Sequence, residues 1–201
     1  LFCFFQLLMC FTLLASSVVE TSTQQIKKNK NKTAKLFSLL EKAIAKHAIG
    51  QLEAGAQVIQ IFDSWASIAK KKDLQFFSID PIKRICNLIK SKKPKAHIIV
   101  FPRNVGQDYT KYIYKHIDCI SVGEDIKAEE IKEIQKKKVI QGNLSPKVLY
   151  NGGKKLEKET IKILKRFANK PFIFNLSHGI MPKTPIENVK QLIKLIRKHG
   201  K

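Results

Sequence analysis

From Leu36 onward the chain alternates between two hydrophobic patterns. Segments with apolar residues every three or four positions predict helices, and the short runs of β-branched and aromatic residues between them predict strands. The predicted helices span about residues 36–55, 80–91, 106–116, 127–136, 154–167 and 185–198. The predicted strands are QVIQIFDSW, AHIIVFP, DCISVG, KVIQGNL and FIFNLS, which begin at residues 57, 96, 118, 138 and 172.

This alternation predicts an α/β fold. Strands that are each followed by a helix pair in parallel through right-handed crossovers. Two architectures fit the pattern. One is a five-stranded open sheet of flavodoxin type, which this chain would complete by itself; the other is a (β/α)8 TIM barrel, of which this chain would hold about five to six βα units.

Both architectures place a ligand site beyond the carboxyl ends of the strands. Polar or small residues follow every predicted strand. Taken singly, each could cap a helix or serve a turn; taken together, they favour a ligand pocket. These residues are Asp63 and Ser64, Arg103 and Asn104, Gly123 to Asp125, Gly142 and Asn143, and Ser177 with His178.

The N-terminal segment allows several interpretations. LFCFFQLLMCFTLLASSVV, residues 1–19, has no charged residue and is long enough for a membrane span or a secretory signal. The basic residues of 27–35 would suit the cytoplasmic flank of an anchor. The start at Leu1, without a methionine or a basic leader, favours instead a buried barrel segment of something larger. We therefore divide the chain into an apolar segment with a basic linker, residues 1–35, and a folded unit, residues 36–201.

The charge of the chain is strongly positive. Its 38 lysines and arginines against 16 acidic residues give a formal net charge of +22, which can indicate a nucleic-acid or anionic membrane partner. The lysines are dispersed, however, and only KKNKNKTAK at 27–35 is dense. This dispersal favours solvated helix surfaces over a specific nucleic-acid site, with non-specific RNA or DNA binding as the alternative.

Metal and cofactor motifs are absent from the sequence. The four cysteines form no C-x-x-C pair, and the five histidines form no H-E-x-x-H motif, so we expect no structural metal and favour a reducing cytoplasm. No G-x-G-x-x-G or G-K-S/T follows the first strand, and no nucleophile elbow is present. The glycines of NGGKK, from Asn151, predict a turn.

Four stretches carry a resemblance to a known family. GAQVIQIFDSWA (55–66), VFPRNVG (100–106), QGNLSPKVLY (141–150) and FNLSHGIMPKTPIENV (174–189) resemble, in order and separation, signature stretches of uroporphyrinogen decarboxylase. The similarity runs from about Leu36 to Lys198 and more faintly through FTLLASSVVE. It corresponds to the C-terminal part of the family's usual length.

This resemblance implies a (β/α)8 barrel, commonly a homodimer, that acts on a tetrapyrrole. The implied reaction removes carbon dioxide from the four acetate arms of uroporphyrinogen III and gives coproporphyrinogen III, on the route to haem. The family needs neither a metal nor an organic cofactor for it.

The resemblance also assigns roles to individual residues. Ser64 matches a substrate-contacting hydroxyl, with Phe62 lining the pocket, and His178 matches a histidine that binds a substrate carboxylate. Ser16 or Ser17 stands near the place of a tyrosine that the family carries in a stretch like TLxxYMxEG, so that ring and its hydroxyl are missing here, and we expect Ser17 to contact the substrate. Arg103 either lies near the pocket or forms a structural ion pair.

Several positions depart from the family pattern. LFCFFQLLMCFT replaces a glycine-rich GFCGAPFT, Ser67 and Ser177 stand where glycine is usual, and SVGEDI replaces a more apolar turn. The family's arginine-bearing N-terminal stretch and its key aspartate would precede Leu1.

Three interpretations compete. The chain is part of a decarboxylase, a truncated or inactive copy, or a basic binding protein that has reused the scaffold and contacts a membrane through residues 1–19. A cobalamin- or zinc-linked methyltransferase relative is less favoured, since Gly179 and Ile180 follow His178 where a His-x-Cys zinc pair would be expected. Because an incomplete barrel leaves two strand edges unpaired, we expect the isolated chain to aggregate or to need a partner.

Overall fold

The computed structural model describes residues 6–8, 30–64, 66–69, 71–168 and 170–200. Within them, six parallel strands form one sheet in the order β1-β2-β3-β4-β5-β6. The strands are β1 (Gln6–Leu8), β2 (Val58–Asp63), β3 (His97–Pro102), β4 (Cys119–Ser121), β5 (Val139–Leu144) and β6 (Phe172–Leu176).

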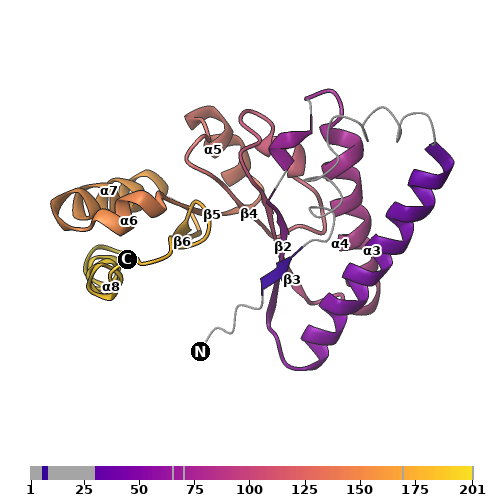
Figure 1. The fold of residues 1–201 in the computed structure, drawn as a ribbon, viewed down its shortest axis with the longest axis horizontal. Helices are drawn as coiled ribbons and strands as arrows, with labels where there is room; N and C mark the ends of the chain where they lie inside the picture. The colour runs from indigo at the N-terminus through magenta and orange to yellow at the C-terminus, as the bar shows by residue number, and fades with distance from the viewer. Residues whose placement is uncertain (1–5, 9–29, 65, 70, 169, 201) are drawn as a thin grey trace.

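The strand order decides between the two predicted architectures. In a flavodoxin-type sheet the order reverses after the first connection, whereas a barrel adds each strand beside the previous one. The consecutive order found here is that of a barrel. Figure 1 shows the helices following an arc around the strands, from α3 (Lys30–Glu53) at one end to α8 (Ile186–His199) at the other.

The remaining helices fill this arc. They are α4 (Asp80–Lys92), α5 (Ala128–Gln135), α6 (Pro146–Asn151) and α7 (Gly153–Phe167), with a π-helical turn at Gln75–Ile79 and 3-10 turns at Ala66–Ile68 and Tyr109–Tyr112. The spacing of buried residues explains their packing. In α7, for example, Leu156, Thr160, Ile163 and Phe167 are buried, and this three-to-four spacing forms one stripe against the sheet.

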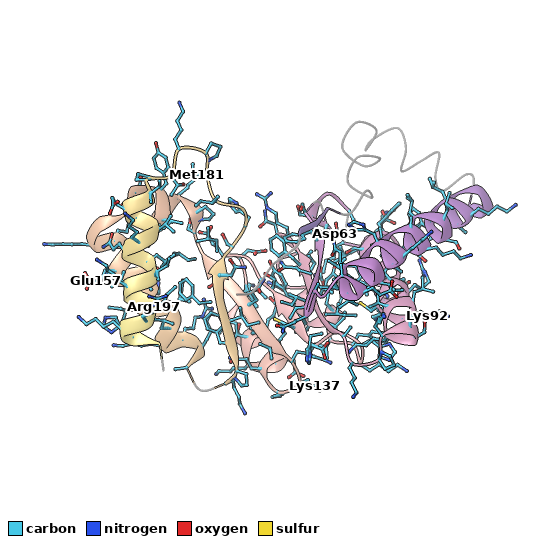
Figure 2. All side chains as sticks on the ribbon, turned by 90° about the horizontal axis from the view of Figure 1, so that it is seen from below. Asp63, Lys92, Lys137, Glu157, Met181 and Arg197 are labelled. Carbon is cyan, nitrogen blue, oxygen red and sulfur yellow. The ribbon has the colours of Figure 1, made fainter. Side chains whose placement is uncertain are left out.

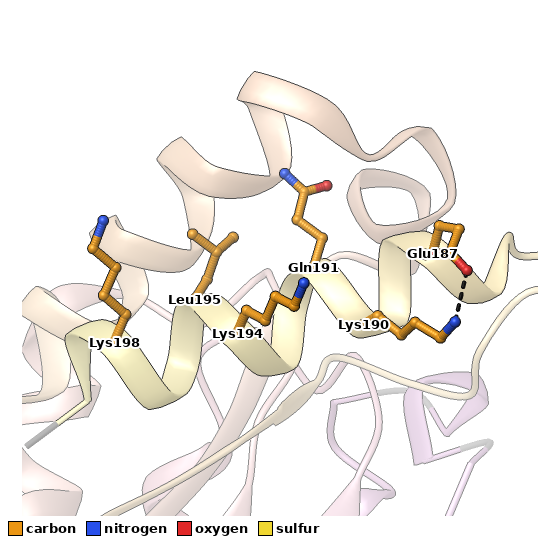
Figure 3. Close-up of a pocket in the computed structure, with 6 residues that line it drawn as sticks. All are labelled: Glu187, Lys190, Gln191, Lys194, Leu195 and Lys198. Carbon is orange, nitrogen blue, oxygen red and sulfur yellow. Dashed lines mark hydrogen bonds and ion pairs between the residues drawn. The ribbon is translucent and has the colours of Figure 1, made fainter.

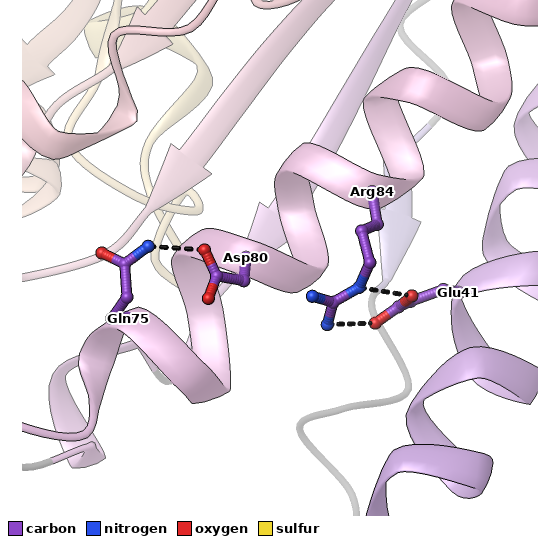
Figure 4. A network of polar contacts seen from close by, with 4 residues as sticks. All are labelled: Glu41, Gln75, Asp80 and Arg84. Atoms are coloured by element: carbon purple, nitrogen blue, oxygen red, sulfur yellow. Dashed lines mark hydrogen bonds and ion pairs between the residues drawn. The ribbon is translucent and has the colours of Figure 1, made fainter.

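Helices α3 and α4 are joined by an ion pair. The Arg84 guanidinium of α4 donates from Nε and from one terminal nitrogen to the two carboxylate oxygens of Glu41 of α3, at 2.9 and 2.8 Å (Figure 4). Glu41 is buried and Arg84 is half exposed. In the same figure Gln75 donates to Asp80 at the start of α4. These contacts hold the helical layer together on the side opposite the barrel interior.

The two faces of the sheet bury different chemistry. Alternate residues, such as Ile59, Ile61, Ile98 and Val100, pack with the helices in the main apolar core. The residues between them face the barrel side, as the two-residue repeat of a strand requires. On β2 to β5 that side carries Gln60, Phe62, Ile99, Phe101, Cys119, Ser121, Gln141 and Asn143.

A polar ladder crosses the barrel side of the sheet. The side-chain nitrogen of Gln141 lies 3.2 Å from Gln60 Oε1 and 3.2 Å from Ser121 Oγ, so one amide links β5 to β2 and β4. Gln141 is fully buried, and its own Oε1 has no hydrogen-bond partner. Net contributions of such bonds are modest, but leaving a buried member unpaired costs about 1–3 kcal/mol.

Element boundaries agree closely with the sequence prediction, with three differences. The helix predicted over 106–116 is only the short turn at Tyr109–Tyr112. The backbone leaves the helical conformation on both sides of this turn, since Gly106 has a φ of 62° and Ile113 is extended, with φ of −66° and ψ of 106°. Carboxylates hold the loop: Gly106 N donates to Asp125 Oδ2 at 2.8 Å and Tyr109 N to Glu130 Oε1 at 3.0 Å.

The other two differences concern helix boundaries. Helix α3 begins at Lys30 rather than near residue 36, so the expected division at 35 falls inside it. Helix α6 was not predicted, although Ser145 followed by Pro146 is a helix-start signal. The turn predicted for NGGKK is present, because Gly152 ends α6 and Gly153 begins α7, both at φ of 64°.

The N-terminal segment is described only at Gln6–Leu8. These residues form β1, paired in parallel with Gln60 to Phe62 of β2, which supports a barrel segment over a membrane anchor at that point. Residues 1–5 and 9–29, including Ser17, lie outside the described part of the chain. No helix within the described ranges is apolar over a length that would cross a membrane.

Candidate active site at the carboxyl ends of the strands

The predicted site residues gather along one edge of the sheet. In Figure 2, Asp63 and Met181, which lie at or beyond the carboxyl ends of β2 and β6, stand on one side, and Lys92 and Lys137, which precede β3 and β5, stand on the other. Parallel strands end on the same side, and this is where ligand sites of α/β folds form.

Phe62 and Ser64 lie where β2 ends. Phe62 pairs with Phe101 of β3 in register, and their rings meet edge to face with centroids 5.9 Å apart. Ser64, two residues on, is half buried in the turn that follows the strand. The two aromatic rings therefore form a wall on the barrel side, beside the Ser64 hydroxyl.

Asp63, between them, is engaged on the helix side of the sheet. Its Oδ2 accepts from Ser78 Oγ at 2.5 Å, and the Ser78 oxygen lies 2.6 Å from the Tyr112 hydroxyl. Because the single Ser78 proton goes to Asp63, Tyr112 donates to Ser78 and must stay protonated. Burial raises the pKa of Tyr112, in agreement with this assignment. Asp63 thus anchors the backbone beside Ser64.

A second anchor holds the loops after β3 and β4, and it was not predicted from the sequence. The Tyr109 hydroxyl donates to Asp125 Oδ1 at 2.8 Å and accepts from Gly123 N at 2.9 Å. Burial, followed by the charge of Asp125, raises the pKa of Tyr109, so the phenol remains a donor. Asp125 had been noted only as a polar strand-end residue, and Tyr109 as part of a helix. The pairing depends on a fold-level contact that local patterns do not show.

Gly142 and Asn143 lie near the end of β5, close to β4. The Asn143 side-chain nitrogen donates to Gly123 O at 2.9 Å. Gly142 has a φ of 138°, and a Cβ there would stand 2.6 Å from the Val122 carbonyl oxygen. Only glycine permits both this conformation and this approach, so the Gly142 position is needed for strand pairing.

His178 follows β6 and is half buried. Its Nδ1 lies 3.1 Å from the carbonyl oxygen of Gly179. A carbonyl oxygen only accepts, so Nδ1 carries a proton and Nε2 is the ring nitrogen left for a ligand. A carboxylate also only accepts, and it would therefore bind the ring when Nε2 is protonated as well.

Two departures from the family pattern contact each other. Ser177, which stands where glycine is usual, is buried, and its hydroxyl donates at 2.9 Å to Oε1 of Glu124 in the SVGEDI turn. This bond joins the loop after β4 to the loop after β6, next to His178.

The structure thus brings Phe62, Ser64 and Arg103 together on β2 and β3, and links Asn143 to the loop after β4. It shows no direct contact between His178 and Ser64 within the described ranges. Arg103 forms no ion pair with a described residue.

Two further features lie apart from these strand ends. A groove of about 340 Å³ runs along α8, lined by Glu187, Lys190, Gln191, Lys194, Leu195 and Lys198 (Figure 3). Among the described residues, no three histidine, cysteine or acidic side chains gather in a way that could hold a metal ion.

Comparison with known proteins gives one family. The sequence model of the family described as Uroporphyrinogen decarboxylase (URO-D) matches residues 8–199. Uroporphyrinogen decarboxylase of Rickettsia rickettsii (strain Sheila Smith) is 38% identical over 179 residues, which are 89% of this chain and 52% of that protein. The protein of the same name from Orientia tsutsugamushi (strain Boryong) is 39% identical over 165 residues, 81% of this chain and 48% of that protein.

The chain therefore spans about half the length of these relatives. The family match covers nearly all of the chain, including Ser64, Arg103 and His178. It also covers strands β2 to β6 and the last residue of β1. On this ground, together with the consecutive parallel sheet, the chain belongs to the uroporphyrinogen decarboxylase family.

Proposed function

We propose that this chain supplies the C-terminal part of a uroporphyrinogen decarboxylase, which converts the four acetate arms of uroporphyrinogen III to methyl groups and gives coproporphyrinogen III in haem biosynthesis. The observation that carries the proposal is the family match over residues 8–199, with the FDSWA and NLSHG motifs at strand ends of one parallel sheet. A tetrapyrrole substrate, a homodimeric complete form and a cytoplasmic location belong to the same proposal.

The chemistry of each step balances without an added cofactor. Protonation of a pyrrole ring carbon beside the acetate arm creates an electron-poor ring. The bond between the arm's CH2 and its carboxylate then breaks, carbon dioxide leaves, and the electron pair forms an exocyclic C=C bond. A proton adds to that CH2 to give the methyl group, and the ring carbon releases its proton. Each arm consumes one proton overall, and the step is catalysed by positioned charges and proton donors.

The residues of this chain are proposed to hold the carboxylates rather than to attack them. Ser64 donates its hydroxyl proton to a substrate oxygen, and the half-buried ring of Phe62, braced by Phe101, packs against the tetrapyrrole. His178 is available through Nε2, because Nδ1 is used by Gly179. Ser17 is the fourth proposed contact, and it lies outside the described residues.

The test is conversion of uroporphyrinogen III, followed by separation of products that have lost one to four carboxyl groups. The chain is assayed alone and together with the part of the Rickettsia rickettsii relative that the alignment does not cover. Ser64→Ala and His178→Ala are each expected to lower kcat/KM by about ten- to a hundredfold, the range for a lost charge-assisted hydrogen bond. Their thermal unfolding midpoints should stay close to that of the unchanged chain.

Ser67→Ala is the matched control, since Ser67 is exposed in the 3-10 turn three residues after Ser64. It should leave the rate unchanged. Conversion that is unaffected by His178→Ala would remove this histidine from the site. If no sample converts the substrate, the inactive-copy interpretation replaces the proposal.

A further inference from the structure

We infer that Arg103 is a carboxylate-binding residue of this site, which determines the affinity for the acidic arms of the substrate. The inference deepens the proposed function and rests on it for the identity of the substrate. Four observations on Arg103 carry it: its position, its lack of a partner, its fixed backbone and the chemistry of its side chain.

The position follows from strand register. Arg103 directly follows β3, and its N–H donates at 3.0 Å to the carbonyl oxygen of Asp63, so the pairing of β2 with β3 continues one step past the strands. By the two-residue alternation, Arg103 follows Ile99 and Phe101 on the barrel side, as Ser64 follows Gln60 and Phe62. Arg103 and Ser64 are therefore neighbours at the same edge and on the same face.

The guanidinium has no partner of its own in the described part of the chain. Its Nε is buried and lacks a hydrogen bond, and no described carboxylate lies within ion-pair distance. A buried donor without an acceptor is rare and costly in a folded protein. Arg84 shows the usual arrangement, since both ends of its guanidinium fork are taken by Glu41. Unlike Nε, the two terminal nitrogens of Arg103 are not among the buried unpaired atoms, so an acceptor-rich ligand would bind the guanidinium through them.

The backbone around Arg103 is fixed on both sides. Before it, the bond to Asp63 holds the residue to β2. After it, Val105 is buried and Gly106 N donates to Asp125, which in turn is held by Tyr109. A side chain that starts from a fixed backbone loses less freedom on binding, so the site is preorganised for its ligand.

The chemistry of arginine fits the substrate class. The planar guanidinium presents parallel N–H groups that match the two oxygens of a carboxylate, and it stays charged at any physiological pH. The proposed substrate carries eight carboxylates around its ring. Arg103 beside Ser64 would bind one arm through its fork while the serine hydroxyl binds an adjacent oxygen. We expect this contact to act on binding and to leave the bond-breaking step largely unchanged.

The test measures binding and turnover separately. Binding uses uroporphyrin III, an oxidised and non-reacting octacarboxylate, with quenching of the single tryptophan, Trp65, as the signal. Arg103→Gln should raise the Kd by about tenfold or more, as for loss of a charge-assisted contact. Arg103→Lys keeps the charge but not the fork, and should raise Kd by only about threefold.

Arg197→Gln is the matched control for charge. Arg197 is exposed on α8 and its removal lowers the net charge by the same amount, so Kd should change by less than about twofold if steering by net charge alone is weak. In turnover, Arg103→Gln should raise KM by a similar factor while kcat changes less than twofold. Circular dichroism of each variant checks that the fold is retained, and Arg103→Lys serves if Arg103→Gln does not fold.

The possible outcomes separate the inference from the proposed function. If the chain binds uroporphyrin III through Arg103 but no sample decarboxylates uroporphyrinogen III, the inference stands and the proposed reaction fails. If decarboxylation occurs and neither Arg103 variant changes Kd or KM, the inference fails and the reaction stands. Equal weakening by Arg103→Gln and Arg197→Gln, or no binding of uroporphyrin III at all, would also overturn the role of Arg103.

Discussion

Two regions of the molecule differ in how far they bury the side chains that face the barrel interior. One region is strands β2 to β5, and the other is β6 with the helix α8 that follows it. Gln60, Ser121 and Gln141 are buried in a hydrogen-bonded ladder between strands. On β6 the barrel-side residues Ile173 and Asn175 are exposed. Among the described strands β6 pairs with β5 alone, so its other edge is open.

This difference divides the candidate site in two. Phe62, Ser64 and Arg103 stand on the region whose backbone is fixed by buried polar contacts. His178 stands on the region with the open edge, where the Ser177 hydroxyl joins its loop to Glu124 on the β4 side. We infer that the first half of the site is preformed in this chain, and that the second half depends on what covers the edge of β6.

The largest expected effect separates two glycines, one from each region. Gly142→Ala would put a Cβ 2.6 Å from the Val122 oxygen at a φ of 138°, and we expect it to lower the free energy of unfolding by more than about 3 kcal/mol. Gly179→Ala is the matched change after β6, where a Cβ meets no atom within 4 Å. Urea denaturation should show little change for Gly179→Ala. Equal losses would contradict the division.

A smaller effect is expected from the polar ladder. Gln141→Met keeps the volume and leaves the buried Gln60 and Ser121 without their shared donor, but it also removes the unpaired Gln141 Oε1, so we expect a net cost of about 1 kcal/mol. Asn175→Ala, on the exposed barrel side of β6, should cost less than about 0.5 kcal/mol. Chemical denaturation of both variants measures the two costs. A stable Gln141→Met variant would show that the ladder does not hold the sheet.

The link between the regions should have a still smaller effect. Glu124→Gln and Ser177→Gly each remove or weaken the bond of 2.9 Å, and the double variant should show a coupling energy of about 0.5–1 kcal/mol. Ser177→Gly also restores the residue usual in the family. Additive effects of the two changes on the thermal midpoint would mean that the bond contributes nothing measurable.

The two thiols in the described part of the chain, Cys86 of α4 and Cys119 of β4, should show no reaction while the chain is folded. Cys86 and Cys119 are buried, and burial raises the pKa of each thiol to about 12. A raised thiol pKa favours the neutral, unreactive form, so at pH 8 only ~10⁻⁴ of either thiol is ionised. Mass spectrometry after iodoacetamide treatment should find both unlabelled until denaturant is added. Rapid labelling of Cys119 under native conditions would show that the sheet opens.

The sequence predicted most of the fold because the periodicity is regular. The five strands from residue 57 onward and four of the six predicted helices fall within about two residues of their structural bounds, and the resemblance correctly identified the family. The segment from Gly106 to His116 was misjudged because its backbone is left-handed at Gly106 and extended at Ile113, and because its loop is held by Asp125 and Glu130, which lie beyond the next strand. Local patterns cannot show such contacts.

The strand-end positions of the candidate residues could be predicted from the sequence, but the contacts that support them could not. Strand ends located Ser64, Arg103 and His178, since parallel strands end together. The anchoring pairs of Tyr109 with Asp125 and of Ser78 with Asp63 join residues 15 or more positions apart. The lack of a partner for Arg103 is likewise visible only once every neighbouring side chain is placed.

The most direct test is the rate of uroporphyrinogen III decarboxylation by this chain alone and in the presence of the part of the Rickettsia rickettsii relative that lies outside the alignment. We expect little conversion by the chain alone, because the β6 side of the site has an open edge, and a rise of at least tenfold when the added part covers it. Equal rates with and without the added part would contradict the dependence on that edge. No conversion in either sample would contradict the proposed reaction.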